Sequence, residues 1–198
     1  MKSFYLFLFL SMFQSFGQNI SEINKDLNLS DTLEFEKEIR IYKDYSNATR
    51  IDFFRMFDSG ENNWIVYIYY YNKEFKSVTK IDRIDFPKEN SGMLKVKDAN
   101  LIWLNFLICD VEFLPNLKDI DYKLKKASIE LEDGEYGISK KKIATLDGVG
   151  YTVFVKNGKV ENNFIFDSPD CYLKYYPNVD ELISYNQILS VIKKEFNL

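Results

Sequence analysis

Apolar and polar residues alternate along much of the first half of the chain, and this period of two predicts β-strands. Between residues 33 and 41, the apolar side chains fall on one side, while charged residues such as Glu38 and Arg40 fall on the other, which indicates a strand with one face in water. Further strands are predicted at 49–57, 64–71 and 78–86. Because the intervening turns are short, these segments are expected to form an antiparallel meander.

Two longer segments have helical patterns of different kinds. Asp98 is a typical N-cap for a helix over 99–109, which is apolar nearly all round and is therefore expected to be buried. This segment is too short to cross a bilayer. Near the C-terminus, Asn178 and Glu181 are typical of a capping box. The helix that follows carries one apolar stripe, formed by Leu182, Tyr185, Leu189, Ile192 and Phe196.

The last third also predicts a hairpin and a short helix. Asn157-Gly158 lies between a strand predicted at 151–155 and its partner strand predicted at 159–166, and this dipeptide favours a type I′ turn because both central positions need positive φ. Ser168-Pro169 indicates the start of a short helix. The charged stretch 118–146 has only scattered apolar positions, and we interpret it as two edge strands.

These elements predict a single α+β domain over residues 18–198. Its core is an antiparallel sheet of about five to seven strands, with the buried central helix and the C-terminal amphipathic helix packed on one face. Residues 18–32 lack apolar periodicity and are expected to be flexible, although the polar part at 19–30 is also compatible with a short helix.

The first 17 residues have the three parts of a secretory signal peptide. Lys2 provides the positive start, residues 4–13 form the apolar region, and Ser15 and Gly17 are the small residues of a cleavage site. We therefore expect an exported protein, periplasmic or extracellular, with no membrane span once the leader has been removed.

Composition narrows the possible chemistry. The chain is 46% hydrophobic and 28% charged, as in globular proteins, and its formal net charge of −4 argues against nucleic acid and anionic membranes as partners. It contains no histidine, which excludes a Ser-His-Asp triad, an imidazole proton shuttle and a zinc site with His ligands. No catalytic residue, metal site or cofactor is predicted.

Two cysteines, Cys109 and Cys171, leave two interpretations open. An exported protein is in a compartment that permits disulfides, so the two residues could be joined. Alternatively, both are free and buried thiols, because Cys109 ends the most apolar segment of the chain.

A cluster of aromatic residues on the third predicted strand is the candidate binding surface. Together with arginines of the neighbouring strand, the cluster comprises Trp64, Tyr67, Tyr69, Tyr71, Arg50 and Arg55. Aromatic faces with a polar rim bind sugars, peptides or protein partners. The alternative is that both faces of the sheet are covered and these aromatic side chains pack among themselves.

The C-terminal region resembles a known group of proteins. The order strand, Asn157-Gly158 turn, strand, helix with the sequence Ser-Pro-Asp-Cys-Tyr-Leu from Ser168, Tyr-Pro-Asn and amphipathic helix is similar to that of uncharacterised small exported proteins of Bacteroidota. The leader, which ends in Phe-Gly before Gln18, is also similar to theirs. The resemblance implies a bacterial envelope or extracellular location and no activity.

Three functions remain as hypotheses. The first is a non-enzymatic exported binding or interaction protein of the cell envelope, whose partner is an envelope glycan or another protein. The second is an acidic periplasmic immunity or inhibitor protein that masks a basic toxin or enzyme. The third is a secreted hydrolase that uses carboxylates, which would require two facing carboxyl groups in a cleft.

Overall fold

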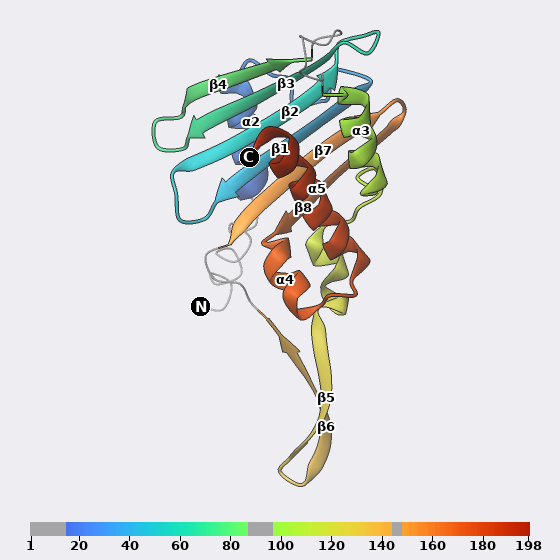
Figure 1. Cartoon of the computed structure of the whole chain (residues 1–198). Coiled ribbons are helices and arrows are strands. Elements are labelled where there is room, and N and C mark those ends of the chain that lie inside the picture. Colours follow the sequence, from blue (N-terminus) through green and yellow to red (C-terminus); the bar gives the residue numbers. More distant parts are fainter. Residues whose placement is uncertain (1–14, 87–96, 144–147) are drawn as a thin grey trace.

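The computed structural model describes residues 15–86, 97–143 and 148–198 (Figure 1). Residues 1–14, most of the predicted signal peptide, lie outside the described part. The helices are α2 (Ser15–Asp26), α3 (Ala99–Ile108), the 3-10 helix η2 (Leu117–Lys123), α4 (Pro169–Tyr175) and α5 (Asp180–Phe196). The strands are β1 (Lys37–Tyr45), β2 (Arg50–Asp58), β3 (Trp64–Asn72), β4 (Ser77–Asp85), β5 (Lys125–Glu132), β6 (Glu135–Lys142), β7 (Val149–Asn157) and β8 (Val160–Asp167).

Six strands form one antiparallel sheet in the order β4-β3-β2-β1-β7-β8. This confirms the predicted α+β fold, the meander of the first four strands and the C-terminal hairpin. The hairpin joins the meander through β7, which pairs with β1 so that Val153 lies opposite Ile41. Strands β5 and β6 correct the prediction of two edge strands, because in the described part of the chain they pair only with each other.

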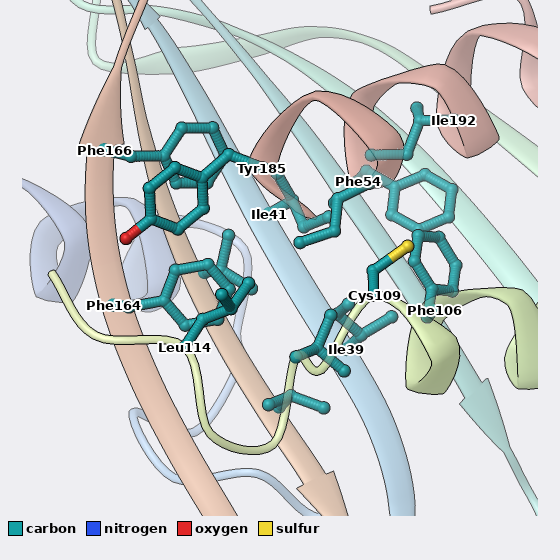
Figure 2. Close-up of a cluster of buried hydrophobic side chains, with 14 of the residues drawn as sticks. Ile39, Ile41, Phe54, Phe106, Cys109, Leu114, Phe164, Phe166, Tyr185 and Ile192 are labelled. Carbon is teal, nitrogen blue, oxygen red and sulfur yellow. The ribbon is translucent and has the colours of Figure 1, made fainter. Parts of the chain in front are cut away.

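One face of the sheet, here called the helical face, carries α3, α4 and α5 over the main hydrophobic core (Figure 2). Ile41 and Phe54 from neighbouring strands lie beneath α5. The ring of Tyr185 in α5 stacks on Phe166, with 4.5 Å between centroids, and its hydroxyl donates to the carbonyl of Pro115 at 2.6 Å. The C-terminal helix therefore packs on the sheet as its apolar stripe predicted.

The central helix α3 is only half buried, which corrects the prediction of burial on all sides. Asp98 caps it as expected, accepting from the Leu101 N–H at 3.1 Å. Its buried residues are Ala99, Ile102, Trp103 and Phe106, and its exposed apolar residues are Leu101, Leu104 and Ile108. The sheet and α5 contact α3 from one side, and no described element covers the outer side.

Helix α2 lies on the opposite face of the sheet, here called the α2 face (Figure 1). This face has its own smaller core. Ile23 of α2 is fully buried among aromatic side chains such as Tyr42 and Phe53. Tyr42 donates to the Asn24 side chain at 2.5 Å, and Tyr71 donates to Asp26 at 2.7 Å. Residues 18–32, which were expected to be flexible, are thus tied to the sheet, and the helical alternative is the one observed.

The cysteines are both free, so the disulfide interpretation is not what the structure shows. Cys109 is buried at the end of α3, where its thiol contacts the carbonyl of Asn105 at 3.0 Å, whereas Cys171 is exposed on α4. Burial, with a smaller contribution from Asp110, raises the pKa of the Cys109 thiol to about 11.

This difference predicts unequal thiol reactivity. At about pH 8 the Cys109 thiol stays almost fully protonated, so a thiolate-specific reagent should modify only Cys171 in the folded protein. The measurement is titration with dithiobis(nitrobenzoate), which should detect one fast thiol in the native protein and two after denaturation. Cys171→Ser should remove the fast reaction, and rapid modification of both thiols in the folded protein would contradict the assignment.

Candidate functional site

The predicted aromatic platform is not formed, because its members lie on two faces of the sheet and are largely covered. Trp64 lies in the helical-face core, 5.4 Å from Trp103 between ring centroids, and its indole N–H donates to Asn100 at 2.9 Å. Tyr69 and Tyr71 are buried on the α2 face, and Tyr67 is partly buried there. Position 64 has the opposite parity to these tyrosines, so alternation sends its side chain to the other face.

Arg55 belongs to a buried ionic cluster on the α2 face. Glu38 accepts from the Nε atoms of Arg40 at 2.7 Å and Arg55 at 2.8 Å, and Glu34 accepts from Arg55 Nη2 at 2.7 Å. Burial acts to raise the pKa of Glu38, but Arg55 and Arg40 outweigh it and hold the pKa below its ordinary value. A carboxylate held ionised in this way is a structural anchor and not a proton donor.

Arg50 contacts Asp52, a residue that lines the pocket described below. It is on the helical face, where its guanidinium binds Asp52 through Nε and through Nη2 at 2.8 Å. The Tyr45 hydroxyl also donates to Asp52, at 2.9 Å. Asp52 is only 4% exposed, and a buried charge needs a partner. Arg50 and Tyr45 provide that partner without a ligand.

A row of cations and aromatic rings extends from this cluster across β1–β4. Lys43 Nζ lies 4.9 Å from the ring centroid of Tyr45, and the Arg50 guanidinium carbon lies 4.8 Å from that of Tyr70. Lys80 Nζ is 5.1 Å from the same Tyr70 ring. Such contacts orient the side chains and stabilise the cations at a partly exposed surface.

A pocket of about 350 Å³ lies between the C-terminal half of α5 and strands β1, β2 and β7. Its apolar lining consists of Ile41, Phe54, Leu189, Ile192 and Leu198. Its polar lining consists of Lys43, Asp52, Tyr151 and Lys193. This volume is at the lower end of the range for sites that bind small molecules.

Two lysines at the pocket, Lys43 and Lys193, form no ion pair among the described residues. Lys43 lies opposite Asp52 in the register of β1 and β2, but Asp52 is bound by Arg50. Burial is the main cause that raises the pKa of Tyr45 and of Tyr151 to about 12. Both tyrosines therefore keep their hydroxyl protons near neutral pH and act as hydrogen-bond donors, not as bases.

The sequence contains a signal for this site in the charged residues that follow the apolar sides of β1 and β2. Ile39 and Ile41 define the buried side of β1, and Lys43 continues on that same side. Asp52 likewise shares a side of β2 with Phe54. When a charged residue takes the next position on the otherwise apolar side of a strand, it indicates where the helices that cover that face of the sheet end.

The two buried carboxylates of the described residues do not form the facing pair that the hydrolase hypothesis needs. They are Glu38 and Asp52, and alternation places them on opposite faces of the sheet. Each is already engaged by arginine. A pair of facing acid and base groups, which glycoside hydrolysis requires, is therefore not formed by these two residues.

The pocket and the row of cations and aromatic rings beside it bring together apolar, cationic and aromatic groups that can bind a ligand. Within residues 15–86, 97–143 and 148–198, no cluster of three or more acidic or cysteine residues is placed to hold a metal ion. Comparisons of this chain with protein-family models, curated proteins and solved structures find no significant match.

Proposed function

We propose that this chain is an exported, non-enzymatic binding protein whose pocket beside α5 takes a small amphipathic anion. The observation that carries the proposal is the combination of an apolar lining with two lysines, Lys43 and Lys193, that form no ion pair within the described part of the chain. An apolar lining with a few placed polar groups is typical of small-molecule sites.

The lining predicts a ligand with two chemically different parts. An apolar body would lie on Ile41, Phe54 and Leu189, where its transfer from water is favourable. An anionic head group would lie between the ammonium groups of Lys43 and Lys193. The chain as a whole has a formal charge of −4, so attraction of an anion at this point depends on the local lysines and not on the net charge.

An envelope glycan, one of the two partners expected for the aromatic strand, fits the exposed surface less well if it carries no charge. Sugars stack on open aromatic faces, but cations lie over the rings beside the pocket: Arg50 and Lys80 over Tyr70, and Lys43 over Tyr45. These cations favour an anionic group at the same surface.

The export of the protein is part of the proposal. The contacts that Ile20 and Ile23 of α2, and Leu27 after it, make with the sheet all lie beyond Gly17, so a chain cleaved there keeps them. No helix of the described residues has the length and hydrophobicity needed to cross a membrane. A periplasmic or extracellular location would expose the pocket to amphipathic anions derived from envelope lipids.

The proposal is tested with two probes of this chemistry, anilinonaphthalene sulfonate and octanoate. We expect the dye to gain fluorescence on binding and octanoate to displace it. The variant Lys43→Ala/Lys193→Ala should weaken octanoate binding about tenfold or more, because both cations at the head group are lost.

The matched control is Lys194→Ala, since this lysine neighbours Lys193 but is 82% exposed and lies outside the pocket. The affinity of the Lys194→Ala variant for octanoate should equal that of the unmodified protein. If octanoate does not compete with the dye, or if the control loses as much affinity as the pocket variant, the proposed ligand class is wrong.

A further inference from the structure

The β5–β6 hairpin extends away from the body of the protein as a separate two-stranded sheet (Figure 1). Asp133 and Gly134 form its turn with φ of 52° and 84°. One of its faces is apolar, and the exposed fractions of Ile129, Leu131, Tyr136 and Ile138 are 76%, 62%, 81% and 73%. Because an isolated two-stranded hairpin is marginally stable in water, this element is expected to gain from further strands.

The charges inside the hairpin are arranged unfavourably for a single copy. At its base Lys126 lies opposite Lys141, and near its tip Glu132 lies opposite Glu135. Like charges directly opposite each other destabilise an antiparallel pair. The contact of Lys141 with Glu130 at 2.9 Å offsets only part of this repulsion. The base is therefore basic, and the tip is acidic.

The outer edge of β5 is open to pairing. No described strand neighbours it other than β6, and its eight residues contain no proline. The register with β6 continues from Lys125 to Glu132 without a bulge. Natural proteins usually protect a regular exposed edge with bulges, prolines or a cover, so an unprotected one is a template for another strand.

We infer that β5 pairs antiparallel with β5 of a second copy of this chain, about a twofold axis at Ile129. In that register Lys126 lies opposite the partner's Glu132, and the symmetry forms this ion pair twice. Ala127 lies opposite the partner's Leu131 on the apolar face. The two hairpins then form one four-stranded sheet, in which the basic base of each hairpin lies beside the acidic tip of the other.

The side-chain period and the charges together select this register. A shift by two residues keeps the faces together, but it would place either Lys125 opposite the partner's Leu131 or Glu130 opposite the partner's Glu130. A shift by one residue would place apolar side chains opposite polar ones, and a parallel pairing would bring base to base and tip to tip. In the single chain, Lys126 Nζ lies 5.9 Å from the Tyr176 ring centroid, a contact at the hairpin base that lysine can exchange for a carboxylate. The charge pattern along β5 is therefore complementary to that of an antiparallel β5 from a second copy.

Charge reversal tests the inference through the oligomeric state. Sedimentation equilibrium over micromolar to millimolar concentrations should show a monomer–dimer equilibrium for the unmodified chain. Lys126→Glu and Glu132→Lys should each weaken the dimer about tenfold or more, because each places like charges opposite. The double variant Lys126→Glu/Glu132→Lys should restore dimerisation, as should mixing the two single variants.

A cysteine at the axis provides a second readout. In a Cys171→Ser background, Ile129→Cys should form a covalent dimer under mild oxidation, because the two residues at position 129 face each other across the axis. Leu131→Cys, on the same face but away from the axis, is the control and should remain largely uncrosslinked. A chain that is monomeric at every concentration, as expected if the hairpin binds a different protein, would overturn the inference, and so would equal crosslinking at both positions.

Discussion

Replacing Glu38 with glutamine is expected to lower the free energy of unfolding by about 3–5 kcal/mol. Glu38 is fully buried and accepts from both Arg40 and Arg55, which are themselves buried. Glutamine nearly preserves the shape but removes the charge, so two guanidinium groups would share Glu34, whose side chain is 45% exposed. Breaking a buried ion pair by removing one partner leaves an uncompensated charge, which costs more than the pair contributes.

Urea unfolding followed by circular dichroism measures this loss. The matched control is Glu36→Gln, an exposed glutamate two residues earlier, for which we expect a change within about 0.5 kcal/mol. A loss below about 1 kcal/mol for Glu38→Gln would show that the arginines find other partners and that the cluster is not the anchor described above.

The same carboxylate makes folding stability depend on pH. The pKa of Glu38 is lower in the folded protein than its ordinary value of 4.5. Its contribution is therefore fully present above pH 4.5 and is lost as the pH falls through the lower folded value. Glu38→Gln removes this titration, so the acid-induced fall in stability should be shallower in the variant than in the unmodified protein.

Much of the fold was predictable because the strands and helices are locally consistent with the sequence. The alternation in β1–β3 and the Asn157-Gly158 turn lie close to the observed strand bounds, and the apolar stripe of α5 predicted its packing. These signals come from side-chain periods and turn geometry that do not depend on distant residues. Their success is therefore physically expected.

The assignment of Glu38 and Arg40 to a water-facing side was wrong for a physical reason. Alternation shows that β1 has two different sides, but it does not show whether another element covers the polar one. Here α2 and the segment leading to β1 cover that side, and charges that pair with each other replace contact with water. A buried ionic cluster and a solvated charged face have the same sequence pattern.

The pocket beside α5 was only partly predictable for a related reason. Arg50 was identified through its position across the sheet, but the partners that matter, Lys43 and Lys193, come from β1 and α5. Their proximity depends on how α5 crosses the sheet, which a single sequence does not specify. The aromatic strand appeared more suggestive because its composition is unusual, yet those rings mainly build the two cores.

Helix α2 determines whether the α2 face is buried, and this makes Ile23 its most informative residue. The side chain is fully buried in the small core with Tyr42, Phe53 and Tyr71. Ile23→Ala is expected to lower the free energy of unfolding by about 2–4 kcal/mol, because it removes buried methyl groups and leaves a cavity under the helix. Both urea unfolding and the rate of proteolysis after Lys25 should report the change, since a loosened helix becomes accessible to trypsin.

Lys25→Ala is the matched control on the same helix, because this lysine is exposed. Its effect on the free energy of unfolding should stay within about 0.5 kcal/mol. The comparison is best made on a chain that begins at Gln18, where every contact of α2 from Ile20 onward is retained. If Ile23→Ala leaves stability unchanged there, α2 does not close this face of the sheet, and the aromatic side chains of β1–β3 are open to solvent as a surface.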